Sequence, residues 1–376
     1  MRKKILHIIS SLNDGGAEGV LYKIASYDDI HDTEHAGITL TEGEKYSRLL
    51  LDKGVFVKEL HMHGFTKSFL AFFILWFYIL RERPFVVQTW MYHADVIGGT
   101  ASLLAGVGNI VWNIRSGEIH SSQKLTTRIF IKLSALLSNF IPRRIVSCSN
   151  RAIDIHKKIG YKGKFSLINN GVNESIFYPS SKKRLKIRSE FSIEDSCVFF
   201  GMVARFDPQK DHFNLLQAIA NITSDNYKVI LVGSNVYSSN VKLLNWIDKL
   251  GISSKVILSG QRNDIPDIMC GIDFLILPSL YGEAFPNVLI EAMSVGTPCI
   301  ATDIGDSARV LGNCGWIVKP NSPTDLSDAI KLAINVKVNN IIKYNAISEQ
   351  CINRTKEEFS IESMIYNYKN VWNGGG

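Results

Sequence analysis

Short apolar runs alternate with longer helical patterns along the whole of this 376-residue chain. They occupy residues 5–10, 36–40, 55–60, 86–89, 110–113, 145–147 and 165–168 in the first half, and 198–204, 228–233, 256–259, 274–278 and 298–302 in the second. Apolar strands that alternate with helices predict parallel sheets with helices on both faces. The fold class we expect is therefore α/β of the doubly wound type.

A polar stretch separates the two series of apolar runs. Residues from about 173 to 195 are rich in Lys and Ser, and the chain exceeds the length at which a single hydrophobic core stops growing. We therefore predict two Rossmann-like domains, the N-terminal one over residues 1–172 and the C-terminal one from residue 173 onward.

The distribution of charge and cysteine indicates the class of partner and the cellular compartment of the protein. Residues 1–170 hold 22 Lys/Arg against 14 Asp/Glu, which predicts an anionic partner: nucleic acid, an acidic membrane surface or a phosphorylated substrate. The six cysteines are scattered without metal-ligand spacing, which indicates thiols in a reducing compartment. The N-terminal apolar run is short and contains His7, so we interpret it as a core strand of a cytoplasmic protein, not as a signal peptide.

The segment that says most about function contains Glu283 and Glu291, eight residues apart. Glu283 follows the run 274–278, and Pro286 suits a first helical position because its missing N–H would have no partner there. Glu291 then falls about one and a half turns into the helix. The free N–H groups of the helix start lie between the two acids and can bind a phosphate, so the segment predicts a sugar-nucleotide pocket. The alternative is a solvated loop and helix.

Two cations follow the first strand of the second series. Arg205 comes directly after the run 198–204, and Lys210 opens a predicted helix. Open α/β sheets bind ligands beyond the carboxyl ends of their strands. Arg can bridge two phosphate oxygens while Lys supplies a mobile charge, so the pair predicts a diphosphate clamp. The alternative is that both cations lie exposed in a polar loop.

Two strand ends in the first half carry weaker signals. Gly15 and Gly16 would let backbone approach a phosphate or sugar closely, but their loop lacks the GxGxxG pattern, so we predict no nicotinamide cofactor. His93 could orient a sugar hydroxyl or assist proton movement, and a packing or capping role is equally open. Asp95 is either its partner or a helix cap.

Residues 69–80 are all apolar and basic residues flank them. As a helix they would span about 18 Å, too short for the ~30 Å core of a bilayer. The spacing of Lys124, Arg128 and Lys132 predicts a second, basic amphipathic helix. Residues 69–80 are therefore either a buried helix or part of a surface, made by about 67–83 and 124–144, that docks on an anionic inner membrane. No recognised fold or aromatic platform supports a nucleic-acid partner.

Taken together, the motifs resemble those of the retaining GT-B glycosyltransferases of family 4. The resemblance rests on the glycine loop, 168–173 with Phe177, Arg205 with Lys210, Glu283 with Glu291, 296–303 and 315–318. It implies two Rossmann-like domains facing across a cleft, the second of them over 173–354. It also implies a last helix that crosses back, so that about 355–372 complete the first domain. It further implies a nucleotide-sugar donor, no cofactor and no essential metal.

The resemblance also assigns roles to the candidate residues. Arg205 and Lys210 would hold the donor diphosphate, Glu291 the ribose and Glu283 the donor sugar or its phosphate. Arg262 occupies the loop that frames the base. The expected catalytic set is His93, Arg205, Lys210 and Glu283, and the further donor contacts are Gly15, Gly16, Ala284, Phe285, Pro286 and Asn287. The chain departs from the common family pattern at Ala284, Asp211 and Arg309.

The resulting prediction is a hexosyltransferase of the retaining class. It would move a hexose or N-acetylhexosamine from a nucleotide sugar, which we expect to be UDP-linked, to a polyprenyl-diphosphate-linked glycan in bacterial surface-polysaccharide biosynthesis (O-antigen, capsule or lipopolysaccharide). It would work in the cytoplasm, peripherally on the inner face of the cell membrane. The alternatives are a transferase of the same fold with a soluble or protein acceptor, and a non-catalytic sugar-nucleotide sensor.

Overall fold

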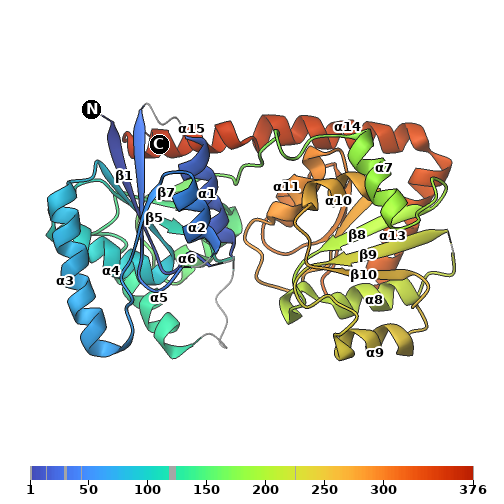
Figure 1. Ribbon diagram of the computed structural model, residues 1–376, viewed down its shortest axis with the longest axis horizontal. Coiled ribbons are helices and arrows are strands. Elements are labelled where there is room, and N and C mark those ends of the chain that lie inside the picture. The colour runs from blue at the N-terminus through green and yellow to red at the C-terminus, as the bar shows by residue number, and fades with distance from the viewer. Residues whose placement is uncertain are drawn as a thin grey trace. The chain divides into compact units, whose positions relative to one another are not determined.

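The computed structural model describes residues 2–13, 15–28, 32–43, 45–117, 124–224 and 226–375, with the backbone alone for Phe65. The chain divides into two compact units, Met1–Gly171 with Ile361–Gly376 and Val172–Ser360 (Figure 1). The return to the first unit, expected from about residue 355, begins at Ile361 because the preceding helix, α14 (Ile341–Glu358), continues within the second unit.

A seven-stranded parallel sheet in the order β3-β2-β1-β4-β5-β6-β7 forms the first unit. Its strands are β1 (Lys3–Ile9), β2 (Thr33–Thr39), β3 (Phe56–Glu59), β4 (Val86–Trp90), β5 (Ile110–Ile114), β6 (Arg144–Ser147) and β7 (Phe165–Leu167). Its helices are α1 (Gly16–Tyr27), α2 (Lys45–Asp52), α3 (Gly64–Glu82), α4 (Met91–Leu104), α5 (Leu125–Leu137), α6 (Asn150–Lys158) and α15 (Ile361–Trp372).

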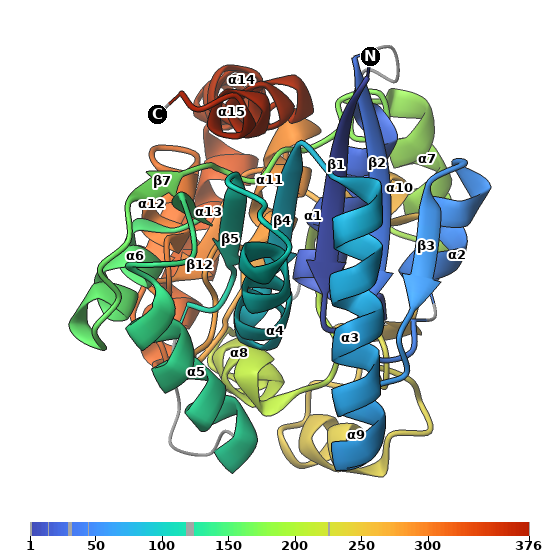
Figure 2. The ribbon, with the colours of Figure 1, turned by 90° about the vertical axis from the view of Figure 1, so that its left-hand side faces the viewer.

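Helices cover both faces of this sheet because alternate residues of each strand point to opposite sides. In β1, Ile5 and Ile9 belong to the core under α1 and α15, whereas Leu6 and Ile8 belong to the core under α3 and α4. Helices α3, α4 and α5 lie side by side on one face (Figure 2). The all-apolar β strands are therefore buried on both sides, as parallel strands usually are.

A six-stranded parallel sheet in the order β10-β9-β8-β11-β12-β13 forms the second unit. Its strands are β8 (Val198–Val203), β9 (Tyr227–Val232), β10 (Val256–Gly260), β11 (Phe274–Leu277), β12 (Cys299–Thr302) and β13 (Gly315–Val318). Its helices are α7 (Ser181–Glu190), the 3-10 turn η1 (Pro208–Lys210), α8 (His212–Ala220), α9 (Val241–Lys249), α10 (Ile265–Gly271), α11 (Asn287–Ser294), α12 (Ser307–Leu311), α13 (Pro323–Asn339) and α14.

The doubly wound α/β class is thus confirmed in both units, and every predicted strand overlaps an observed one. One strand was not predicted. β13 is a short edge strand that begins at a glycine, and its four residues are too few for a periodic pattern to stand out from a loop.

Candidate active site

Beyond the ends of β8 and β11, Lys210 and Glu283 form a direct ion pair. Lys210 is the last residue of η1, and Glu283 lies in the loop between β11 and α11. Lys210 Nζ donates a hydrogen bond to Glu283 Oε1, and both side chains are largely buried. The two residues that the sequence placed 73 positions apart therefore form one charged group at the carboxyl edge of the sheet.

The Glu283 carboxylate has a second hydrogen-bond donor, Ser279. Ser279 Oγ donates to Glu283 Oε1 at 2.7 Å, and Thr302 Oγ1 donates to the Ser279 carbonyl at 2.6 Å. The backbone N–H of Asp306 donates to the Ala284 carbonyl at 3.0 Å, which ties the same loop to the end of β12. Among the described residues, Glu283 Oε2 has no hydrogen-bond partner, so this oxygen is available to a ligand.

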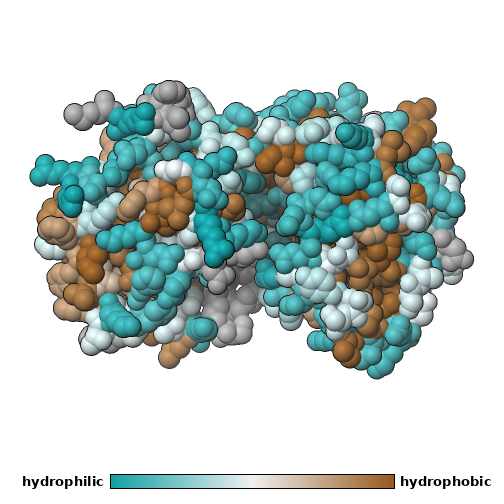
Figure 3. Space-filling model, in the orientation of Figure 1, coloured by the Kyte–Doolittle hydropathy of each residue, from teal (hydrophilic) through white to brown (hydrophobic). Residues whose placement is uncertain are grey.

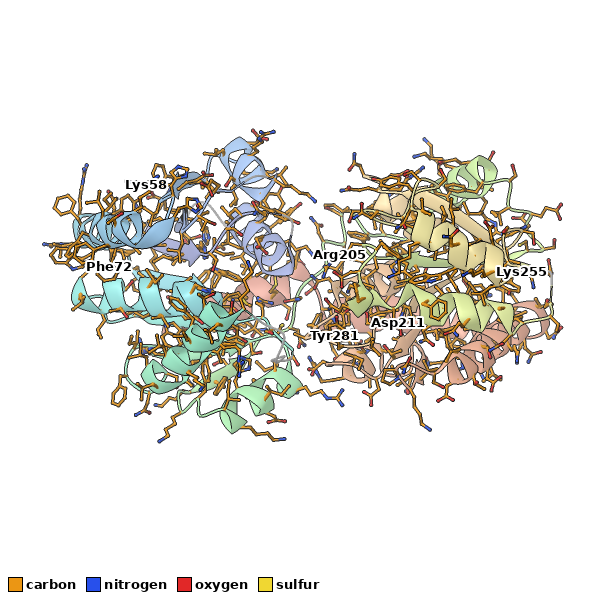
Figure 4. All side chains as sticks on the ribbon, turned by 90° about the horizontal axis from the view of Figure 1, so that it is seen from below. Lys58, Phe72, Arg205, Asp211, Lys255 and Tyr281 are labelled. Atoms are coloured by element: carbon orange, nitrogen blue, oxygen red, sulfur yellow. The ribbon has the colours of Figure 1, made fainter. Side chains whose placement is uncertain are left out.

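Arg205 lies beside this pair and is exposed. Its side chain is 55% exposed, its Nε donates to Asp207 at 3.2 Å, and its Nη2 donates to Gln209 Oε1 at 3.1 Å. The Gln209 carbonyl in turn accepts from the N–H of Leu280, on the loop that leads to Glu283. Arg205 and the neighbouring loop residue Tyr281 lie at one end of the second unit, while Lys255 lies at the opposite end (Figure 4).

Asp211 shows why glycine is common at its position. Its φ of 47° and ψ of 52° are left-handed, a region that glycine enters freely and that Asp tolerates better than most residues. Its carboxylate also accepts a hydrogen bond from the Asn214 N–H (3.3 Å), so it caps α8. The next residue, His212, is buried, and burial followed by the nearby Lys210 charge lowers its pKa to about 4. His212 is therefore a neutral side chain next to the Lys210 ammonium group.

The start of α11 differs in one detail from the expected arrangement. Pro286 is the N-cap with extended backbone (φ −78°, ψ 101°), one position before the first helical residue Asn287. An N-cap also lacks an acceptor for its own N–H inside the helix, so proline fits there for the same reason. The Pro286 side chain has no hydrogen-bond acceptor, so it does not cap the first N–H groups of α11. Glu291 is half-buried in the second turn.

Two of the departures from the common family pattern, Ala284 and Arg309, lie in or next to the loop between β11 and α11. Ala284 and its neighbour Phe285 are buried. Arg309 donates from Nε to Asp306 Oδ2 at 2.7 Å, and its guanidinium lies 5.9 Å from the ring centroid of Phe285. Arg309 therefore links Asp306 to Phe285 in the loop between β11 and α11.

Arg262 is not brought to Lys210 and Glu283. Its guanidinium donates to both carboxylate oxygens of Glu190 (2.5 and 3.0 Å) and to both of Asp264 (2.8 and 2.7 Å). Four of its five N–H donors are thus used in tying the start of α10 to α7.

In the glycine loop of the first unit, an added Cβ would find open space at Gly16 but not at Gly15. A Cβ on Gly15 would collide with the Glu18 carboxylate, which folds back over the N-terminus of α1. A Cβ on Gly16 would meet nothing within 4 Å, and its φ is not positive. Packing and backbone conformation therefore give no reason for glycine at residue 16. The remaining loop residue, Asp14, lies outside the described residues.

His93 and Asp95 lie in the first turns of α4, but they do not form a pair. His93 is half-buried, its ring centroid is 4.4 Å from that of Phe130, and burial lowers its pKa. Asp95 was expected to partner His93 or to cap the helix, and both alternatives are wrong. It is fully buried and accepts a hydrogen bond from Thr89 Oγ1 at 2.5 Å, because it falls one turn inside α4 where its side chain points to the strand.

Sequence reasoning missed Ser279 and Arg115. Arg115 follows β5 and donates from Nη1 to Asn170 Oδ1 and from Nη2 to the Tyr368 hydroxyl at 2.5 Å, so it joins the segment that leaves the first unit to the helix that returns. Its place directly after an apolar strand was a usable signal. Ser279 has the same signal, a hydroxyl just past the run 274–278, but hydroxyls are too common in loops to be chosen on that ground.

In the described ranges, no three His, Cys, Asp or Glu residues cluster as metal ligands would. All six cysteines are free thiols.

Comparisons with known proteins place this architecture. The crystal structure of HepE from Anabaena in complex with UDP has a TM-score of 0.87 at 21% identity, covering 98% of this chain and 99% of that one. HepE has also been solved with UDP-glucose. A likeness at this identity shows the fold, so the chain has the GT-B fold of two Rossmann-like domains with helices at its C-terminus.

Sequence comparison reaches further. The model of the family "Glycosyl transferases group 1" matches residues 183–354. A UDP-Gal:alpha-D-GlcNAc-diphosphoundecaprenol alpha-1,3-galactosyltransferase of Escherichia coli is 25% identical, over 81% of this chain and 79% of its own length. An N-acetylgalactosamine-N,N'-diacetylbacillosaminyl-diphospho-undecaprenol 4-alpha-N-acetylgalactosaminyltransferase of Campylobacter jejuni is 31% identical over 39% of each chain. Residues 183–354 therefore form a domain of the glycosyl transferases group 1, family 4, and the chain is a glycosyltransferase of this retaining, metal-independent class.

Proposed function

We propose that the protein transfers a hexose or N-acetylhexosamine from a UDP-sugar to a polyprenyl-diphosphate-linked glycan in the assembly of a bacterial surface polysaccharide. The observation that carries the donor half of this proposal is the group formed by Lys210, Glu283 and the loop that holds them. It supplies a cation for a diphosphate and a free carboxylate oxygen for a sugar hydroxyl in one place.

In this proposal Arg205 and Lys210 hold the donor diphosphate and stabilise the charge that develops on it when the sugar leaves. Glu283 holds the donor sugar and Glu291 the ribose. Preorganised groups that meet a developing charge usually contribute most to the rate acceleration of an enzyme. The phosphate leaves from the face that the acceptor hydroxyl approaches, so no strong base is needed near the acceptor. The remaining donor contacts are the backbone at Gly15, Gly16, Ala284, Phe285, Pro286 and Asn287, with His93 near the sugar.

UDP is the nucleotide that the relatives support. HepE binds UDP and UDP-glucose, and the Escherichia coli relative is named for UDP-galactose. The acceptor class also follows the relatives, because the Escherichia coli and Campylobacter jejuni enzymes are both named for diphosphoundecaprenol-linked substrates. A lipid-linked acceptor requires the enzyme to work at a membrane surface.

The outer face of α3 is suited to such a surface. Ala71, Leu75 and Ile79 are buried against the sheet. The opposite side exposes six large apolar residues: Phe69, Leu70, Phe73, Ile74, Phe77 and Leu80. Apolar residues gather over this helix at the left of Figure 3. A fully buried helix is therefore excluded, and so many exposed apolar side chains on one helix exceed the scattered ones of an ordinary surface.

Helices α4 and α5 extend this surface on the same face of the sheet. Leu103 and Leu104 are exposed at the end of α4. On α5 and its ends, Leu125, Ile129, Leu133, Leu136 and Phe140 are exposed beside Lys124, Arg128 and Lys132. Within the described ranges these three cations pair with no carboxylate. Apolar side chains next to unpaired cations are the composition of a helix that lies in an anionic membrane interface.

We therefore propose that the protein works on the cytoplasmic side, peripherally on the inner face of the membrane, through residues of about 67–83 and 124–144. No helix in the described part of the chain is long and apolar enough to span a bilayer. A flotation assay with vesicles that contain phosphatidylglycerol tests the surface. The double variant Phe73→Ser/Phe77→Ser should lose vesicle binding, whereas Leu332→Ser, an exposed leucine on α13, should retain it. Wild-type protein that ignores anionic vesicles would remove the membrane part of the proposal.

The transfer reaction is tested by two measurements on the full chain. Thermal stabilisation by a panel of nucleotide sugars identifies the donor, because a ligand that binds the folded protein more tightly raises the melting temperature further. A product assay with that donor then compares a polyprenyl-diphosphate-linked sugar with free sugars and peptides as acceptors. Transfer only to a soluble acceptor supports the first alternative. Tight UDP-sugar binding with neither transfer nor donor hydrolysis supports a sensor.

A further inference from the structure

Ser279 is a fully buried serine that shares one oxygen of Glu283 with Lys210. Its Oγ donates to Glu283 Oε1 at 2.7 Å, the same oxygen that accepts from Lys210 Nζ. The carboxylate is thus held by one charged and one neutral donor. Its other oxygen is left without a protein partner within the described residues.

The neutral donor is itself fixed in place. The Ser279 carbonyl accepts a hydrogen bond from the buried hydroxyl of Thr302, and Ser279 directly follows the central strand β11 and Pro278. A short side chain on a rigid strand end has little freedom to move. Lys210, by contrast, reaches Glu283 through four methylene groups and a freely rotating ammonium group.

Donor binding must disturb the ion pair. If Lys210 holds the diphosphate, its ammonium group turns wholly or partly from Glu283 Oε1 towards the phosphate oxygens. If Lys210 were the only donor to Glu283, the carboxylate would move with the ammonium group or shift to a position from which it repels the incoming phosphates. A second, stationary donor prevents this movement.

We infer that Ser279 is a positioning residue for the donor sugar, which acts through Glu283. Its hydroxyl keeps Oε1 in place while Lys210 changes partner, so that Oε2 stays directed at a sugar hydroxyl. The inference rests on the proposed function and deepens it, because it names the group that separates sugar binding from diphosphate binding. A serine that served packing alone would have no influence on the sugar beyond the nucleotide.

A double-mutant cycle on the full chain tests this inference, with UDP, UDP-galactose and UDP-glucose as probes measured by calorimetry. Ser279→Ala should weaken binding of the better UDP-sugar roughly tenfold, the value of one hydrogen bond to a charged group, and should change UDP binding less than twofold. In the Glu283→Ala background, Ser279→Ala should have no further effect, because the residue through which it acts is gone. Ser327→Ala is the matched control, since Ser327 is also buried and its Oγ donates at 2.9 Å to a carbonyl, that of Thr324 on α13.

Three results would overturn the inference: equal losses for UDP and UDP-sugar, a loss that persists without Glu283, or a loss no larger than that of Ser327→Ala. If Ser279→Ala does not fold, Ser279→Cys replaces it, because the thiol is close in volume and a weaker donor, with an expected loss of about threefold. Wild-type protein that binds none of the three probes would instead refute the proposed function, and the inference with it.

Discussion

The two units share a parallel, doubly wound sheet, yet the candidate site residues beyond their strand ends differ in kind. In the second unit Lys210, Glu283 and Arg205 are charged and already hydrogen-bonded. In the first unit His93 rests against an aromatic ring, and Asp95 is buried with a pKa raised well above its usual range by burial. One fold therefore supports two kinds of strand-end chemistry, and it is the loop residues, not the sheet, that decide which.

The outer surfaces of the units differ in the same sense. The first unit carries the basic excess of the chain and an exposed apolar helix face, while the second is close to neutral. The second unit thus has the groups suited to a charged nucleotide, and the first has those suited to an amphipathic partner. The following predictions test this contrast, from the largest expected effect to the smallest.

Replacing Lys210 should have the largest effect. Lys210→Met removes the cation next to the proposed diphosphate and leaves Glu283 without its ion pair, so we expect transfer to fall by roughly 10² to 10³. Lys255→Met is the control, since Lys255 lies at the opposite end of the same unit, where it donates to the backbone carbonyls of Ile222 and Ser224. The initial rate of product formation decides the matter, and similar losses in both variants would contradict a special role for Lys210.

Acid should destabilise both units through buried neutral histidines. His212 in the second unit has its pKa lowered to about 4 by burial, and burial lowers the pKa of His7 in the first. Because the unfolded chain binds these protons first, the stability present above pH 6.5 is lost as the pH falls. For His212 the window runs from about 6.5 to about 4, at a cost of about 3 kcal/mol.

Denaturant unfolding at several pH values measures this loss. His212→Leu should flatten the dependence of the unfolding free energy on pH between 6.5 and 4, because the side chain that takes up the proton is gone. An unchanged slope in the variant would show that His212 is not buried as described.

Replacing Gly16 should lower donor affinity without harming the fold. Gly16→Ala introduces a methyl group into open space, so stability should be unchanged or rise slightly, while binding of a UDP-sugar should weaken about tenfold if the backbone there meets the donor. Gly108→Ala is a matched control. Its Cβ would also meet nothing within 4 Å, but it lies before β5, at the amino end of the strand. Equal donor affinity in the two variants would argue against contact at Gly16.

The smallest effect concerns the stability of the exposed helix face. Phe77 is 62% exposed, so Phe77→Ser should change the unfolding free energy by less than about 0.5 kcal/mol. Leu75→Ala, two residues earlier on the buried side, should cost about 2–5 kcal/mol. Thermal and denaturant unfolding compare the two variants. A large loss for Phe77→Ser would mean that this face belongs to the core and is not a docking surface.

Much of the fold follows from local patterns in the sequence. The apolar runs predicted each strand that they overlap, because parallel strands buried on both faces need apolar residues at successive positions. Both strand ends that hold charged donor candidates, after 198–204 and 274–278, followed from the same pattern. The edge strand β13 did not, because a short strand beginning at glycine has no distinct pattern.

The partners of the candidate residues could not be predicted in this way. Arg262 and Arg205 are both cations after a strand, yet one is engaged by two carboxylates and the other is mostly exposed. Asp95 looked like a cap or a partner of His93 and is a buried acid bonded to Thr89. These outcomes depend on the three-dimensional packing, which brings in residues such as Glu190 that no local spacing connects to Arg262.

The sequence by itself determined the doubly wound α/β class, the family and which residue types stand at the strand ends. These follow from hydrophobic periodicity and from motifs that are contiguous in the chain. Only the tertiary structure decided that Lys210 meets Glu283, that Ser279 holds the same oxygen, and that one side of α3 stays uncovered. The physical reason is that hydrogen bonds and burial depend on which distant side chains the folded sheet brings within a few ångströms of each other, and that is a property of packing.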